Sequence, residues 1–159
     1  MIKTQKNFLD IGVLQDINNA VMQTTFPWYY SGITSVVEDK NKQFYHTFYH
    51  NNHINSEYYD LIRPILVKLK PVVIMRIKLN LLLKTHKIIE HDDHTDVDSK
   101  SITSSILYLN TNNGYTKFKD RKIMSEENKL VTFPSAVKHH GTTCTDADER
   151  LVLNIMYVR

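Results

Sequence analysis

Residues 150–158 read RLVLNIMYV and alternate in character along their whole length. Successive side chains of a β-strand point to opposite faces, so the segment divides into two sets. One set is apolar or aromatic and would share a face: Leu151, Leu153, Ile155 and Tyr157. The other set is mixed: Arg150, Val152, Asn154 and Met156. We therefore predict a strand that packs a core with one face and can carry a polar site on the other.

Four further runs rich in β-branched and apolar residues precede this segment, at 72–83, 102–109, 116–118 and 130–133. Their lengths and spacing are typical of strands in a sandwich or barrel. Asn112-Asn113-Gly114 lies between two of them, and because these residue types tolerate positive φ, it predicts a tight turn.

The first part of the chain has helical patterns instead. Leu14, Ile17 and Val21 recur at helical spacing, and the pattern stops before Phe26-Pro27. A second helix is expected over residues 56–69, with Ser56 as its cap and Pro64 either kinking it or marking its start. Helices followed by strands in 159 residues predict one α+β domain spanning residues 1–159.

Composition narrows the function classes. The formal charge is +3, but basic and acidic residues are interleaved, which is weak evidence for nucleic-acid binding and none for membrane binding. The most apolar stretch, 71–83, contains charged residues and is too short to span a bilayer. The single cysteine, Cys144, and the lack of a signal-peptide pattern in MIKTQKNFLD lead us to expect a cytoplasmic protein without disulfides. We expect Cys144 to be a small buried residue.

Histidine and acidic residues gather at residues 90–96, which read EHDDHTD. In an extended segment residues i and i+2 point the same way, so His94 with Asp96, or His91 with Asp93, can present an imidazole and a carboxylate to one metal ion. A third ligand is available from the neighbouring histidines at 139 and 140. Two histidines and one carboxylate leave open metal positions, which favours Fe(II) over a closed zinc site.

Arg150 adds a second polar feature at the start of the last predicted strand, on the face shared with Asn154. A buried guanidinium needs an anion, and its planar fork fits a carboxylate. A dicarboxylate could pair one end with Arg150 and chelate iron with the other. The alternative for Arg150 is a surface ion pair with Asp146 or Asp148.

These residues carry a resemblance to a known family. From position 94 to 157 the sequence resembles the prolyl-4-hydroxylase-like branch of the 2-oxoglutarate and Fe(II)-dependent oxygenases, especially small stand-alone members of phages and bacteria. The matching pieces, in order, are His94-Thr95-Asp96, residues 104–110 (SSILYLN), the turn 111–114 (TNNG), residues 139–144 (HHGTTC) and residues 150–154 (RLVLN). Tyr115 departs from the pattern, because many relatives have a second glycine there.

The resemblance implies a fold and a set of site residues. The fold is a double-stranded β-helix, or jelly roll, with N-terminal helices packed on the sheet. The iron ligands are His94, Asp96 and His139. Arg150 is expected to bind the distal carboxylate of 2-oxoglutarate, and the resemblance places the Tyr108 hydroxyl on the same carboxylate and Asn80 near the co-substrate. For Tyr108 the alternative is an aromatic side chain packed in the core.

The implied activity is a dioxygenase that couples decarboxylation of 2-oxoglutarate to succinate with hydroxylation of a substrate, foremost a peptidyl residue such as proline. Fe(II), 2-oxoglutarate and O₂ are expected, with ascorbate as a further candidate. A phage-encoded member would act in the host cytoplasm. Alternatives are oxidation of a nucleic-acid base or a small molecule, or a non-catalytic binding module on the same fold.

Two aromatic-rich stretches, 26–30 and 44–50, are expected to pack the helical layer onto the sheet, with stacking on a substrate as the alternative. The remaining histidines of this region, His46, His50 and His53, have no acid at ligand spacing and are expected at the surface or in loops.

Overall fold

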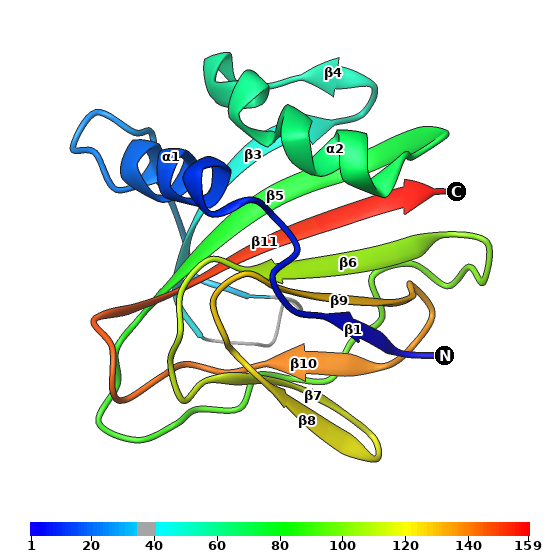
Figure 1. Ribbon diagram of the computed structural model, residues 1–159. Helices are drawn as coiled ribbons and strands as arrows, with labels where there is room; N and C mark the ends of the chain where they lie inside the picture. The colour runs from blue at the N-terminus through cyan, green and yellow to red at the C-terminus, as the bar shows by residue number, and fades with distance from the viewer. Residues whose placement is uncertain (35–40) are drawn as a thin grey trace.

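The computed structural model describes residues 1–34 and 41–159. In this part of the chain two antiparallel sheets face each other, and a layer of helices covers the outer face of the larger sheet (Figure 1). The two ends of the chain lie on the same side of the molecule. This arrangement confirms the predicted α+β jelly roll with N-terminal helices packed on the sheet.

The larger sheet has eight strands among the described residues, in the order β1-β9-β6-β11-β5-β3-β2 with β4 paired to β3. Their bounds are β1 (Lys3–Gln5), β2 (Tyr29–Ser31), β3 (Gln43–His50), β4 (His53–Ile54), β5 (Val73–Leu83), β6 (Thr103–Tyr108), β9 (Lys129–Pro134) and β11 (Glu149–Val158). The smaller sheet has the order β10-β7-β8, with bounds β7 (Tyr115–Phe118), β8 (Arg121–Met124) and β10 (His139–Gly141).

All five runs that the sequence predicts as strands are strands, namely β5, β6, β7, β9 and β11. The largest omission is β3, which occupies the aromatic-rich stretch 44–50 and pairs with β5. Its sequence, QFYHTFYH, mixes aromatic and polar residues on both faces because both faces are partly covered. Without a clean alternation, the pattern did not indicate a strand.

The helical layer consists of α1 (Ile11–Val21), a 3₁₀ helix η1 (Glu57–Ile62) and α2 (Arg63–Leu69). The second helix predicted over 56–69 is thus two elements. Ser56 caps the first of them, since its hydroxyl accepts a hydrogen bond from the backbone N–H of Tyr58 at 3.0 Å. Pro64 lies in the first turn of α2, where its missing N–H costs nothing.

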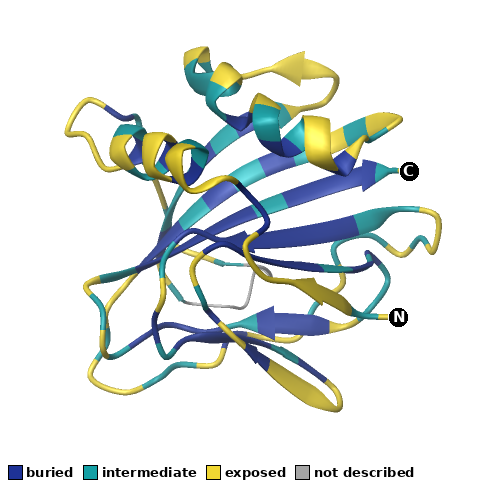
Figure 2. Ribbon diagram, in the orientation of Figure 1, coloured by how far each residue is buried: buried dark blue, intermediate teal, exposed yellow. Residues whose placement is uncertain are grey.

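The central strand β11 separates two cores. Its apolar face packs beneath the helices in one cluster, and β11 and β6 are buried along most of their length (Figure 2). The residues of β11 in this cluster are Leu151, Leu153, Ile155 and Tyr157, as the alternation predicts. On the opposite face Val152 joins a smaller cluster between the sheets with Tyr108, Phe118 and Phe133. One strand therefore serves both layers.

The aromatic stretches pack under the helices in part: Phe26 and Phe48 are buried there, whereas Tyr29 and Tyr30 are exposed and Tyr45 lines a cavity on the other face of the sheet. The prediction that His46 lies at the surface is wrong, because its ring is buried against Phe26. Its Nδ1–H donates to the Pro27 carbonyl at 2.8 Å, which leaves Nε2 to accept the Ser56 hydroxyl at 2.7 Å. Burial lowers the pKa of His46, so the ring stays neutral while both nitrogens have partners.

The predicted tight turn at 112–114 is also wrong. These residues connect β6 in the large sheet to β7 in the small sheet, so they do not close a hairpin. None of the three has a positive φ. The Asn112 side chain instead accepts a hydrogen bond from the Gly114 N–H at 3.0 Å and bends the crossing.

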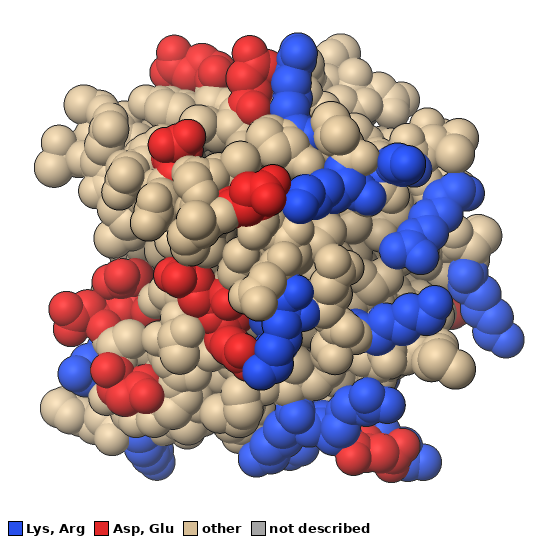
Figure 3. Space-filling view, in the orientation of Figure 1, with Lys and Arg blue, Asp and Glu red and all other residues tan. Residues whose placement is uncertain are grey.

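On the face shown in Figure 3, acidic residues gather toward the left and basic residues toward the right and lower edges. Charges that alternate in the sequence thus separate partly in space, yet this face is not uniformly basic. Among the described residues, no helix has the length and apolar character needed to cross a bilayer.

Leu153 lies in the core on β11, and Leu83 has more than half of its surface exposed at the end of β5. We predict that Leu153→Ala lowers the free energy of unfolding by about 2–5 kcal/mol, because the truncation leaves a cavity. Leu83→Ala removes the same atoms and should cost less than about 1 kcal/mol. Urea denaturation followed by circular dichroism measures both; equal losses would contradict the described core.

Candidate metal centre

A cavity of about 560 Å³ opens between the two sheets. One wall is the face of β5 and β11 that points away from the helices, including Asn80 and Arg150. The opposite wall is formed by the segment that carries His94 and Asp96 and by His139 on β10. The polar face that the alternation of β11 predicts therefore lines a cavity.

Backbone pairing brings the first two candidate ligands to the third. His94 donates its N–H to the carbonyl of His139 at 3.0 Å, and His139 returns an N–H bond to His94 at 2.9 Å. A second bridge joins Glu90 to Thr142, so residues 90–94 run antiparallel to β10. This pairing sets the positions of the candidate ligands because they belong to, or directly follow, the bridged residues.

His94, Asp96 and His139 each offer a ligand atom, and these atoms lie within 4.8 Å of one another. His139 donates its Nδ1–H to the Val137 carbonyl at 3.0 Å, and His94 Nδ1 lies 3.3 Å from the Asp92 carbonyl. These contacts leave Nε2 of both rings as the coordinating atom. Burial lowers the pKa of His139, which favours the neutral imidazole that a metal requires.

The carboxylate of Asp96 is oriented by two donors. Ser104 on β6 donates its hydroxyl to Oδ2 at 2.5 Å, and Arg76 on β5 donates from Nη2 to Oδ1 at 3.3 Å. Both donors come from the large sheet, so they tie the ligand segment across the cavity. Oriented ligands of this kind are typical of metal centres.

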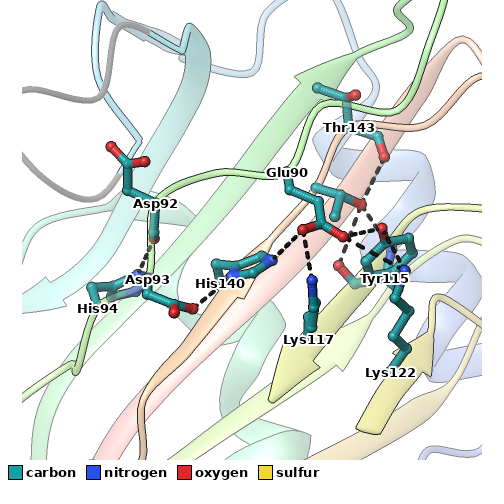
Figure 4. A network of polar contacts seen from close by, with 10 residues as sticks. Glu90, Asp92, Asp93, His94, Tyr115, Lys117, Lys122, His140 and Thr143 are labelled. Carbon is teal, nitrogen blue, oxygen red and sulfur yellow. Dashed lines mark hydrogen bonds and ion pairs between the residues drawn. The ribbon is translucent and has the colours of Figure 1, made fainter. Parts of the chain in front are cut away.

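Among the described residues, the alternative pair, His91 and Asp93, does not converge on one point with a third ligand. Asp93 turns to His140 and accepts its Nδ1–H at 2.6 Å (Figure 4). His91 is buried and lines the cavity. The structure thus brings together the set with His94, Asp96 and His139 that the family resemblance implies.

His140 belongs to a polar network that anchors the ligand segment to the small sheet (Figure 4). Its centre is Glu90, which accepts hydrogen bonds from Lys117 at 2.8 Å and from the Tyr115 hydroxyl at 2.6 Å, with His140 Nε2 3.4 Å away. The bonds from Lys117 and Tyr115 lower the pKa of Glu90 to about 2. Tyr115, the departure from the family pattern, therefore has a definite partner here.

Arg150 is 2% exposed and lies deep in the cavity. Its Nε donates to the Ser125 hydroxyl at 2.8 Å, Nη2 lies 3.5 Å from the Thr116 hydroxyl, and the guanidinium sits 5.5 Å from the centre of the Tyr108 ring. No acidic side chain of the described residues forms an ion pair with it, so the surface pair with Asp146 or Asp148 is excluded. A buried cation with only neutral partners and free N–H groups suits an anionic ligand.

Gly114 makes room for this arginine. A Cβ atom built at Gly114 would lie 2.6 Å from Cδ and 2.9 Å from Nε of Arg150. Such distances are far below van der Waals contact, so only glycine lets the backbone pass this close. Glycine is needed here because the backbone passes close to the Arg150 side chain, and not because the residue adopts the positive φ that the sequence pattern suggested.

The two remaining predicted residues both face this region. Tyr108 is fully buried, as a core aromatic would be, and its hydroxyl donates to Thr116 at 2.8 Å. Burial raises the pKa of Tyr108, which keeps the phenol protonated and able to donate. Asn80 lines the cavity opposite Val152 of β11, and its buried Oδ1 has no hydrogen-bond partner among the described residues.

Sequence reasoning missed four polar residues of the site: Arg76, Ser104, Thr116 and Ser125. Arg76 could have been found, because it alternates with Lys78 and Asn80 on one face of a predicted strand. The hydroxyl residues carry no such signal, since serine and threonine are common on strands and loops alike.

Comparison with known proteins gives matches among solved structures. No protein-family model and no curated protein matches this sequence. A prolyl-4-hydroxylase from Pseudomonas putida aligns at 16% identity over 99% of this chain and 92% of that one, with a TM-score of 0.63. A 2OG-Fe(II) oxygenase family protein from Burkholderia pseudomallei aligns at 16% identity over 99% and 84% of the two chains, with a TM-score of 0.68.

A third similar structure is a prolyl hydroxylase from Trichoplax adhaerens in complex with a hypoxia-inducible-factor peptide fragment. It aligns at 10% identity over 99% of this chain and 83% of that one, with a TM-score of 0.67. The chain has the fold of the 2-oxoglutarate and Fe(II)-dependent oxygenases. At this level of identity the likeness establishes the fold alone. The chemistry depends on the residues of the site.

The two acidic residues Asp96 and Asp93 provide a test of the ligand set. We predict that Asp96→Ala weakens Mn(II) binding by at least roughly 100-fold, because losing even a hydrogen-bond partner of a ligand typically costs 10–100-fold. Asp93→Ala removes the same group from the alternative pair and should weaken binding by less than about tenfold. Isothermal titration with Mn(II) measures both affinities, and a larger loss for Asp93→Ala would assign the site to His91 and Asp93.

Proposed function

We propose that this protein is a 2-oxoglutarate- and Fe(II)-dependent dioxygenase that hydroxylates a peptidyl residue such as proline. The observation that carries the proposal is the pairing of two features in one cavity. Two histidines and a carboxylate converge within 4.8 Å of one another, and a buried arginine without an acidic partner among the described residues lies deeper in the same cavity. The first feature suits Fe(II), and the second suits a dicarboxylate co-substrate.

His94, Asp96 and His139 would hold the metal. Their donor set leaves positions open for a co-substrate, which is the property that separates this arrangement from a closed zinc site. Bound Fe(II) would supply the redox chemistry by which O₂, 2-oxoglutarate and the substrate are converted to succinate, CO₂ and the hydroxylated substrate. The protein's own part is to orient both imidazoles through the contacts of their Nδ1 atoms, so that Nε2 can face the metal, and to orient Asp96 through Ser104 and Arg76.

Arg150 would bind the distal carboxylate of 2-oxoglutarate. Ser125 fixes the guanidinium through Nε, so the two terminal nitrogens can face the ligand. Tyr108 stays protonated and lies beside the same guanidinium, and its hydroxyl donates its one proton to Thr116. Thr116 keeps its own hydroxyl proton for the carboxylate, and Tyr108 would bind the carboxylate directly by exchanging its bond to Thr116. We assign Asn80 to the co-substrate as well, because its side-chain oxygen lies in the same cavity without a partner among the described residues.

Apolar side chains complete this part of the cavity. Leu82, Ile106 and Val152 line it beside Arg150. They limit the access of water to the guanidinium, which strengthens its attraction for a carboxylate. A water-poor pocket also protects a reactive site from side reactions.

The support for the substrate class comes from the similar structures. Prolyl hydroxylases are among the similar structures, and one of them is described with a bound peptide. These matches support a peptidyl substrate. Oxidation of a nucleic-acid base or a small molecule is the alternative within this chemistry, and a non-catalytic ligand-binding module is the alternative outside it. A cytoplasmic location, one domain over residues 1–159 and no stable membrane association belong to the same proposal.

The decisive measurement is succinate release from 2-oxoglutarate by protein loaded anaerobically with Fe(II) and then exposed to O₂. We expect turnover in the wild type and none in His94→Ala. Arg150→Ala should lower kcat/KM for 2-oxoglutarate at least roughly 30-fold, because it removes one partner of a buried charge pair. This factor corresponds to a loss of transition-state stabilisation of about 2–5 kcal/mol.

The matched control is Arg63→Ala, since Arg63 is largely exposed on the helical layer and forms an ion pair with exposed Asp60. Its kcat/KM should stay within about twofold of the wild type. Metal and 2-oxoglutarate binding without succinate release, over a range of peptides, nucleosides and small molecules, would favour the binding-module alternative.

Gly114 gives an independent test of the role of Arg150. We predict that Gly114→Ala weakens 2-oxoglutarate binding by about tenfold or more, about 1.4 kcal/mol, because the new Cβ displaces the arginine. Gly12→Ala is the control: a Cβ there meets nothing within 4 Å, and it should leave binding unchanged while adding about 0.5–1 kcal/mol to helix stability. Calorimetric titration of 2-oxoglutarate into Mn(II)-loaded protein measures the effect, and unchanged affinity in Gly114→Ala would contradict the assignment.

A further inference from the structure

The outer half of the cavity contains two cations: Arg76, which orients Asp96, and Lys78, to which neither the metal centre nor the co-substrate gives a role. Arg76 and Lys78 lie two residues apart on β5, so both side chains point into the cavity. Arg76 contacts Asp96, whereas Lys78 forms no ion pair with an acidic side chain of the described residues. The Lys78 ammonium instead lies 4.8 Å from the centre of the Tyr45 ring.

Lys78 and Arg150 lie far apart along the wall of the cavity. The strand register places Lys78 opposite Asn154 and Leu82 opposite Arg150. These positions are four residues apart, which is about 13 Å along a strand. The two cations therefore belong to different ends of the cavity, and an anion bound by Lys78 is a second anion.

The charges of the cavity also do not balance around the proposed co-substrate. Among the described lining residues, Arg76, Lys78 and Arg150 are the lysine and arginine side chains, and Asp96 is the acidic one. A divalent metal and a doubly charged 2-oxoglutarate cancel each other, and Asp96 offsets one of the three cations. Two positive charges remain, one of them on a lysine that is largely removed from water. Burial, with the neighbouring Arg76, lowers the pKa of Lys78 to about 8, which marks the cost of holding this cation without a carboxylate.

We propose that the substrate of this site is an acidic peptide segment, in which a glutamate or aspartate near the oxidised residue binds Lys78 at the outer end of the cavity. This inference rests on the proposed function and names its substrate class. Tyr45 holds the ammonium in place through its ring, and Arg76 adds to the positive potential while it orients Asp96.

A peptide with one acidic side chain suits these residues better than a nucleic acid does. A nucleic-acid strand presents a phosphate at every nucleotide, and proteins that bind one follow it with a track of basic and stacking residues. Here the described cavity offers one unpaired lysine and one arginine that already contacts Asp96. This is the complement of a single carboxylate.

The test uses blocked peptides and measures binding directly, so it does not depend on turnover. Wild-type protein loaded with Mn(II) is first titrated with 2-oxoglutarate. The resulting complex is then titrated with acetylated and amidated five-residue peptides that contain one proline, with a glutamate placed one or two residues before or after it. Each peptide has a counterpart with glutamine in place of glutamate. We expect at least one glutamate peptide to bind about tenfold more tightly than its glutamine counterpart.

Variants assign this preference to its residue. Lys78→Gln should remove the preference and leave 2-oxoglutarate affinity unchanged, while Lys78→Arg should keep it and shows that the strand tolerates substitution. Lys87→Gln is the control of equal net charge, because Lys87 is exposed and outside the cavity; it should behave as the wild type. Thermal unfolding checks that each variant is folded.

The outcomes separate the two proposals. Absence of 2-oxoglutarate binding in the wild type means that the proposed function fails, and this inference with it. If 2-oxoglutarate binds but every glutamate peptide binds like its counterpart, only the inference fails. Loss of 2-oxoglutarate affinity in Lys78→Gln would place Lys78 in the co-substrate site. Tighter, Lys78-dependent binding of adenosine monophosphate than of any peptide would replace the acidic peptide with a phosphate-bearing substrate.

Discussion

The pairing of β11 with β5 on one side and β6 on the other is the constraint on which the rest of the molecule depends. Because side chains alternate across a strand, this central strand sends Leu153 and its apolar neighbours into the core under the helices and Arg150 into the cavity. A shift of one residue in either register would exchange the two faces and bury polar groups in the apolar core. Stability and function are thus linked by one register.

The candidate metal centre also requires that an irregular segment, residues 90–96, is fixed in position. Residues 90–96 carry two of the three candidate ligands, yet they form only isolated bridges with β10. The network around Glu90 compensates for this, since Lys117, Tyr115 and His140 join the segment to the small sheet, while Ser104 and Arg76 hold Asp96 from the large sheet. Contacts from both sheets position the carboxylate where regular secondary structure does not.

Much of the fold could be predicted because its strongest signals are local. Strands β5, β6 and β11 are predicted from their runs of β-branched and apolar residues, and α1 is predicted from the helical spacing of its apolar residues. Strand β3 and the short strands β1, β2, β4, β8 and β10 were not predicted, because they lack a run of β-branched residues or a clean alternation of polar and apolar side chains. His46 was wrongly predicted because its burial depends on contacts with distant parts of the chain. Pro27 and Ser56 provide hydrogen-bond partners for both ring nitrogens, which allows the histidine to be buried.

The site divides in a similar way. The sequence alone sets which functional groups are present and how far apart they lie in the chain. They are an imidazole and a carboxylate two residues apart, a distant histidine, and an arginine on the polar face of the last strand. The three-dimensional arrangement brings His94 and Asp96 to His139 and turns Asp93 to His140, shows why position 114 is glycine, and leaves Lys78 without a carboxylate among the described residues. The physical reason is that these outcomes depend on distances between segments remote in the chain, which backbone pairing across two sheets sets and local patterns do not record.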